Sequence, residues 1–145
     1  MSWFADALTG ADEHWLSAVI GQPHHMALWE LLAILVAVRL WRGSRHESAR
    51  IGVRSDSLSA LSALIRGSSP NPAINKLVAE LLLDEAELSA SLGILTHIPG
   101  AANSWPDALS RLSAPEQASV PPALSRVPRS AAPPRDKTFW RVVRL

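Results

Sequence analysis

The sequence predicts an α/β fold, a mixed sheet with flanking helices, followed by a disordered or extended tail. Short β-prone runs alternate with segments whose apolar residues have helical spacing, which is typical of parallel strands joined by right-handed crossovers. Two apolar runs before residue 21 are joined by a turn, which favours an antiparallel edge. After residue 112, six of the 11 prolines fall among Ala, Ser and Arg, with no hydrophobic period.

The first part of the chain is predicted to hold two strands and a long helix. The strands are expected at residues 2–5 and 14–20, with a turn at 9–12 between them. Gly21 and Pro23 would end the second strand. Residues 25–41 have apolar side chains nearly all round a helix, so we expect burial on more than one side.

The middle of the chain is predicted to continue with a strand and two helices. Residues 51–55 form a short β-prone run, followed by a turn and N-cap cluster at 55–57. A helix over 58–65 would stop at Gly67, and another is expected over 73–89. Its apolar face would comprise Ile74, Leu77, Val78, Leu81 and Leu82, with Glu80, Asp84, Glu85 and Glu87 mostly on the other face.

The last predicted elements are a strand over 92–98 and a short helix over 103–112. Pro99-Gly100 closes the strand, and Pro106 is tolerable in the first turn of the helix. The end of the tail, residues 139–145, is locally apolar and basic. It is either a docking segment or the point where a longer parent chain continues.

Charge and composition narrow the class of protein. The net charge is +1, yet residues 1–112 carry 8 basic and 11 acidic side chains, whereas residues 113–145 carry 6 and 2. A slightly acidic body does not favour a large DNA-binding face. The chain has no cysteine and no signal-peptide pattern, and the apolar run of residues 31–38 is too short to span a bilayer. We expect an intracellular protein, cytoplasmic or nuclear, not secreted and not in a membrane.

Three acidic residues stand at informative positions. Glu30 is the only charge in the apolar run 28–38, Asp56 ends the strand at 51–55, and Asp107 opens the last helix. Carboxylates on separate elements are how proteins hold Mg²⁺ ions against a phosphodiester. Each also has a purely structural explanation: an exposed helix position for Glu30, an N-cap for Asp56, and a dipole-favoured first-turn acid for Asp107.

The order of elements and three motifs resemble the ribonuclease H domain of reverse transcriptases from retrotransposons of the long-terminal-repeat type. The run from Trp29-Glu30 to Trp41 is similar to the first helix of that family. Arg54-Ser-Asp56-Ser57, followed by Ala60-Leu61, resembles its strand ending in Asp-Ser. The most specific motif is His97-Ile-Pro-Gly100 with Asn103 and Asp107-Ala-Leu-Ser-Arg-Leu112. The resemblance covers about residues 3–112.

The resemblance implies two Mg²⁺ or Mn²⁺ ions held by Glu30, Asp56 and Asp107 as catalytic and metal ligands. The implied reaction is hydrolysis of RNA in an RNA–DNA hybrid, which leaves a 5′ phosphate. Substrate or loop roles carry over to Ser57, His97 and Asn103, with His97 expected to anchor its loop. Some members have a catalytic histidine three residues after this position, where the present chain has Gly100.

The same resemblance leaves one family feature unmatched. The family places its first catalytic aspartate on a central first strand, and neither Asp6 nor Asp12 lies in a matching motif. We therefore expect residues 1–112 to be a ribonuclease H-like domain incomplete at its N-terminus, with residues 113–145 as the tail. Little or no nuclease activity is expected of the isolated chain.

Three other interpretations stay open. One is a non-catalytic nucleic-acid-binding remnant in which Arg54, Arg66, Arg111 and the tail touch phosphates. Another is a protein-interaction module that works through an exposed sheet edge or the Phe139-Trp140 end. The third is a fragment without a function of its own. The candidate partners are an RNA–DNA hybrid or other nucleic acid, and the rest of a pol polyprotein.

Overall fold

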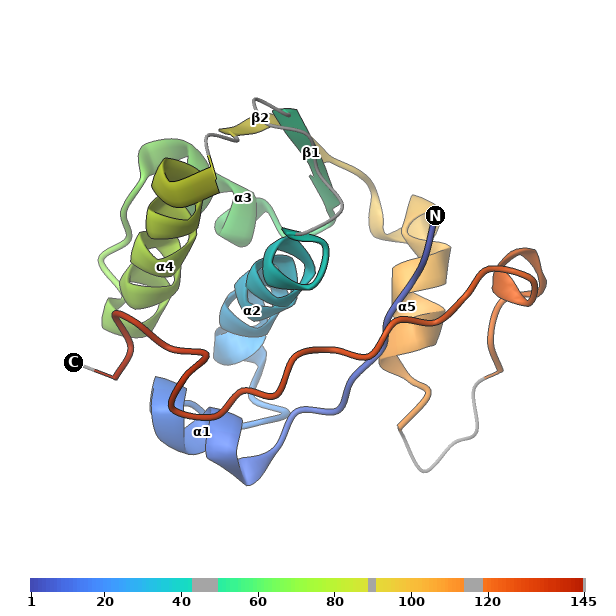
Figure 1. Cartoon of the computed structure of the whole chain (residues 1–145), viewed down its shortest axis with the longest axis horizontal. Coiled ribbons are helices and arrows are strands. Elements are labelled where there is room, and N and C mark those ends of the chain that lie inside the picture. Colours follow the sequence, from blue (N-terminus) through green and yellow to red (C-terminus); the bar gives the residue numbers. More distant parts are fainter. Residues whose placement is uncertain (43–49, 89–90, 114–118, 145) are drawn as a thin grey trace.

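The computed structural model describes residues 1–42, 50–88, 91–113 and 119–144. Within these ranges it is a mixed α/β structure with five α-helices and a two-stranded parallel sheet (Figure 1). This confirms the predicted α/β class. In chain order the elements are α1 (Gly10–Leu16), η1 (Pro23–His25), α2 (Met26–Leu40), β1 (Arg50–Ser55), α3 (Leu58–Arg66), α4 (Pro72–Leu88), β2 (Ser91–His97), η3 (Gly100–Ala102), α5 (Ser104–Ser110) and η4 (Pro122–Leu124).

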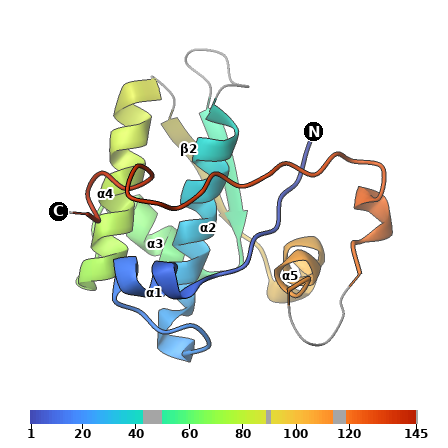
Figure 2. The ribbon, with the colours of Figure 1, turned by 60° about the horizontal axis from the view of Figure 1, so that its bottom comes forward.

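Helix α2 is the central element of the core. It packs against α4 and α3, and its buried side chains are Leu28, Trp29, Leu31, Leu32, Leu35, Val36 and Val38. These residues cover about half of the helix circumference, and of the other helix residues only Met26 and Ala33 are exposed, so α2 is buried on more than one side as the sequence predicts. The sheet and the C-terminal segment lie on opposite sides of α2 (Figures 1 and 2).

The stretch Pro23–Leu40 is long and apolar enough to cross a membrane by length and composition alone. The core helices of soluble proteins pass the same test, and in this fold α2 is the helix on which α3 and α4 pack. The predicted intracellular location therefore stays a prediction.

Strands β1 and β2 pair in parallel from Arg50 opposite Ser91 to Ser55 opposite His97, with an irregularity between Ile51 and Gly52. Side chains of β1 alternate, so that one face of the strand packs inward and the other meets solvent. On the inner face, Leu92 and Leu95 of β2 line a hollow of about 60 Å³ with residues of α3 and α4. Gly67 ends α3 with φ of 70°, a conformation that favours glycine.

The two strands predicted at the N-terminus do not join the sheet. Residues 10–16 form α1 instead of a turn and strand, because the backbone N–H of Thr9 donates to Asp12 Oδ2 at 2.9 Å and so caps a helix. Trp3 forms only an isolated parallel bridge, with Arg129 of the C-terminal segment. The predicted antiparallel edge is therefore replaced by contact between the two ends of the chain.

The expectation of a disordered tail is corrected for residues 119–144, which include η4 and then run as an extended segment across α2 (Figure 2), in agreement with the alternative of an extended tail. Phe139, Trp140 and Val143 belong to the same hydrophobic cluster as α2 and α4, and Trp140 is completely buried. The alternative of a docking segment describes these residues well, but they dock on their own chain. Their few large apolar side chains lie within five positions, too few to produce a recognisable period.

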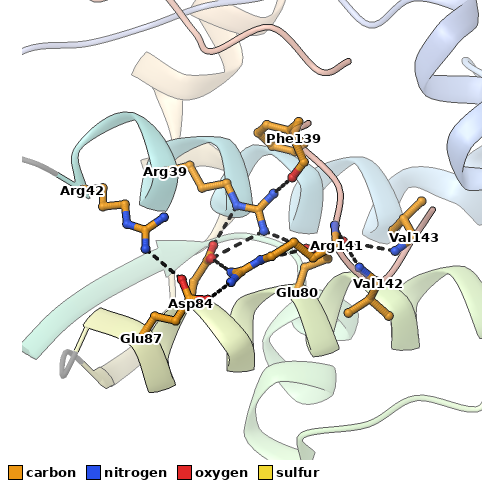
Figure 3. Close-up of polar contacts among 9 residues, drawn as sticks. All are labelled: Arg39, Arg42, Glu80, Asp84, Glu87, Phe139, Arg141, Val142 and Val143. Carbon is orange, nitrogen blue, oxygen red and sulfur yellow. Dashed lines mark hydrogen bonds and ion pairs between the residues drawn. The ribbon is translucent and has the colours of Figure 1, made fainter. Parts of the chain in front are cut away.

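A cluster of charges fastens this segment to α4 (Figure 3). Glu80 and Asp84, predicted mostly on the polar face of the helix, are 0% and 1% exposed. Arg39 of α2 reaches both, with Nη2 at 2.7 Å from Glu80 Oε2 and Nε at 2.8 Å from Asp84 Oδ2. Arg141 pairs with Asp84 as well. Leu82, predicted on the apolar face, is instead 47% exposed.

Glu80 also binds the backbone of the C-terminal segment directly. Its Oε1 accepts from the N–H groups of Arg141, Val142 and Val143 at 2.7, 2.6 and 3.1 Å. Burial by itself raises the pKa of Glu80, but the hydrogen bonds from Arg39 and these three amides outweigh it and lower the pKa from 4.5. The cluster therefore holds an ionised carboxylate inside the core.

Replacement of Trp140 by alanine tests whether the C-terminal segment is part of the core. We expect W140A to lower the free energy of unfolding by about 3–5 kcal/mol, since it empties the site of a fully buried aromatic ring. Urea denaturation measures the loss, and R144A, at an exposed neighbouring position, is the control. Equal stability of W140A and R144A would contradict the packed arrangement.

The buried carboxylate predicts an acid-sensitive stability. A lowered pKa means that the contribution of Glu80 is complete above the unfolded value of 4.5 and is lost as pH falls through the folded value. We expect E80Q to lose about 3 kcal/mol at neutral pH and to show a flatter decline in acid than the unmodified chain. The exposed E87Q variant is the control, with a much smaller change. Parallel acid profiles for E80Q and the unmodified chain would refute this role.

Candidate functional site

Glu30 lies in the second turn of α2, half-buried beside the buried residues Trp29 and Leu31. Burial raises the pKa of its carboxyl above 4.5, and the nearby charge of Asp56 raises it further. A raised pKa means that ionised Glu30 opposes folding, because its stabilising contribution is complete below 4.5 and is lost as pH rises through the folded value. This carboxylate is thus held at a cost to stability.

Asp56 stands at the carboxyl end of β1, between two fixed neighbours. Ser55 is buried, and its carbonyl oxygen accepts from the N–H of Ile98 at 3.0 Å. Ser57 is the N-cap of α3, with its Oγ accepting from Ala60 N–H at 3.2 Å. Ser57, and not Asp56, is therefore the N-cap of α3, so helix capping does not explain Asp56. In the described part of the chain, no hydrogen bond or ion pair engages the exposed Asp56 carboxylate.

The turn after β2 lies against the same carboxylate. His97, the exposed last residue of β2, is opposite Ser55 in the parallel register. A Cβ placed on Gly100 would lie 3.6 Å from Asp56 Oδ2, an ordinary van der Waals contact. The carboxyl ends of the two strands and the start of η3 therefore surround Asp56, at the edge of a parallel sheet where ligands commonly bind.

Asn103 links this turn to α5. It is 8% exposed, its N–H donates to the Gly100 carbonyl at 3.0 Å, and its own carbonyl accepts from Asp107 N–H at 3.1 Å. These bonds make Asn103 a joint between η3 and α5. Its predicted substrate role is not needed to explain its burial.

Asp107 is engaged differently from the other two predicted ligands. Its side chain is 55% exposed, and its Oδ1 lies 3.1 Å from Nη2 of Arg111, one helical turn later. Across residues 1–42, 50–88, 91–113 and 119–144, no group of three or more His, Asp or Glu side chains could hold a metal ion. The structure thus places Asp56 near enough for its charge to act on Glu30, while the inclusion of Asp107 stays a prediction.

The burial of a second acidic pair, Glu80 and Asp84, was not predicted from the sequence. Glu80 and Asp84 are more deeply buried than any predicted ligand, but arginines and backbone amides take up their oxygens. Their spacing of four residues among leucines is a signal for a shared helix face, yet it does not distinguish the buried face from the exposed one. By contrast, no hydrogen bond or ion pair among the described residues engages the carboxylates of Glu30 and Asp56.

Comparisons with protein-family models, with curated proteins and with solved structures each return no match. The functional argument therefore depends on the chemistry of the residues themselves and on the motifs described above.

The Glu30–Asp56 pair predicts a coupled titration. We expect D56N to lower the pKa of Glu30, because the substitution removes the neighbouring negative charge. NMR titration of the side-chain carboxyl carbons measures the change, and D107N is the control. An unchanged Glu30 titration in D56N would show that the two carboxylates do not interact.

Proposed function

We propose that this chain is a ribonuclease H-like nucleic-acid-binding domain in which Glu30 and Asp56 bind one divalent cation, Mg²⁺ or Mn²⁺. The observation that carries the proposal is the placement of two carboxylates on separate elements: Glu30 is half-buried on α2, and Asp56, at the end of β1, is close enough for its charge to raise the pKa of Glu30. Two like charges are held together on separate elements, and no arginine or lysine of the described residues pairs with either. A bound dication would relieve their repulsion.

The donor set fits a single hard cation. Mg²⁺ prefers oxygen ligands and is commonly held by one or two carboxylates, with water and substrate phosphates completing its shell. Glu30 and Asp56 supply two such carboxylates, and the exposure of Asp56 leaves its outer side open to solvent. The two-ion arrangement fits less well, since Asp107 is paired with Arg111 and no third carboxylate joins the described pair.

The order of elements also supports the proposal. The motif residues fall on α2, at the end of β1, and at the end of β2 with the helix that follows, in the order that the resemblance implies. The parallel pairing of β1 with β2 places Asp56 and His97 at the same edge. The N-terminal residues lend no support, because Trp3 pairs with the C-terminal segment.

The proposed chemistry is limited because the proposed site has only two carboxylates. A bound cation supplies Lewis-acid polarisation of a phosphate oxygen. Glu30 and Asp56 would hold it, with Asp56 towards solvent. We propose that the isolated chain binds a hybrid but cleaves it weakly or not at all, because two carboxylates leave the family's ligand set incomplete.

Cation titration tests this function. We expect Mn²⁺ to broaden the NMR signals of Glu30, Asp56 and their neighbours at one equivalent, and E30Q or D56N to weaken binding more than about tenfold. D107N is the matched control and should bind like the unmodified chain. Unfolding measurements on each variant separate loss of binding from loss of structure.

Two results would contradict the proposal. Unchanged Mn²⁺ affinity in both E30Q and D56N would remove the pair as the site, and an equal loss in D107N would replace it with a three-carboxylate site. An RNA–DNA hybrid incubated with Mg²⁺ or Mn²⁺ supplies a further readout. Efficient cleavage that disappears in D56N would overturn the expectation of weak activity.

A further inference from the structure

The outer face of β1 carries a row of exposed positions, Arg50, Gly52 and Arg54. Between them Ile51, Val53 and Ser55 turn inward, so the alternation of the strand places both arginines on the solvent side. At roughly 3.3 Å per residue, their Cα atoms are about 13 Å apart along the strand. The row is therefore a short linear array of positive charge.

Neither of these two arginines has an acidic partner among the described residues. Five arginines are engaged with carboxylates, namely Arg39, Arg42, Arg111, Arg135 and Arg141. Within the described ranges, no hydrogen bond or ion pair occupies the guanidinium of Arg50 or Arg54. Six other described basic residues also make no ion pair, but they lie outside the strand that leads to Asp56, namely Arg66, Lys76, Arg126, Arg129, Lys137 and Arg144.

The row of arginines follows β1 towards the candidate site. Arg54 is the last outward-facing residue of β1 and precedes Asp56 by two positions. The stem of Arg50 lies over β2, where a Cβ on Gly93 would come within 3.2–3.3 Å of its Cβ, Cγ and Cδ. Gly93 therefore leaves the space that Arg50 occupies. The positive row thus runs along the sheet and ends two positions before Asp56.

We propose that Arg54, with Arg50 behind it, is a phosphate-binding arm that holds the backbone of a nucleic-acid strand beside the Glu30–Asp56 pair. The inference rests on the proposed function for its site and adds the residues that position the ligand. A guanidinium offers a planar fork of donors that matches phosphate oxygens. The acidic pair repels phosphate on its own, so the adjacent cations supply the attraction that brings a strand to this edge.

The experiment measures binding of a fluorescein-labelled RNA–DNA hybrid of about 20 base pairs by anisotropy, at several salt concentrations with Mg²⁺ present. One lost phosphate contact is expected to weaken binding roughly eightfold at 0.1 M salt and to lower the slope of log K against log salt by about 0.9. R54A should show both changes, and R54K should retain most of the slope because it keeps the charge. R144A is the matched control, on the segment across α2 from the sheet (Figure 2).

The outcomes separate this inference from the function on which it rests. R54A should leave the Mn²⁺ titration of Glu30 unchanged while weakening hybrid binding, which supports both. Normal salt dependence in R54A, equal effects of R54A and R144A, or no hybrid binding by the unmodified chain would overturn the phosphate-binding arm. A chain that loses hybrid affinity in R54A but binds no Mn²⁺ would keep the phosphate contact and overturn the cation site.

Discussion

The rest of the structure depends on the hydrogen bonds and the ion pair of the buried Glu80 carboxylate. One of its oxygens accepts three successive backbone N–H groups of the C-terminal segment, and the other pairs with Arg39 of α2. An ionised group with no exposed surface is stable only when its charge and lone pairs are fully engaged. Glu80 therefore joins α2, α4 and the C-terminal segment through one side chain, and the burial of Phe139, Trp140 and Val143 follows from that attachment.

Helix α2 links the charged cluster around Glu80 to the candidate site. Arg39 lies near the C-terminal end of α2 and Glu30 near its N-terminal end, with the buried leucines of the core between them. A helix held on several sides is a rigid support, and rigid supports suit groups that must stay close in spite of their repulsion. The cluster thus helps to fix the helix that positions Glu30 against Asp56.

The surroundings of Glu80 and Glu30 shift the pKa values of these two acidic residues in opposite directions. Around Glu80, hydrogen bonds outweigh burial and lower the pKa, so the negative charge stabilises the fold. At Glu30, burial and Asp56 both raise the pKa, so the negative charge works against the fold. Groups that are kept in an unfavourable state by their surroundings are candidates for function, because packing alone gives no reason to hold them there. The exposed arginines of β1 place positive charge on the strand that leads to Asp56.

The amino-acid sequence by itself determined the α/β class, the positions of α2, α3, α4, α5, β1 and β2, and the choice of Glu30, Asp56 and Asp107 as residues of interest. These features depend on local periodicity, caps and breakers, which a short window of sequence contains. The bridge between Trp3 and Arg129 and the packing of Trp140 were decided only by the tertiary structure. So was the burial of Glu80 and Asp84, whereas the Asp107–Arg111 ion pair joins residues only four positions apart. The physical reason is distance along the chain: Glu80 meets amides more than 60 positions away, and no local pattern records which partner will neutralise a charge.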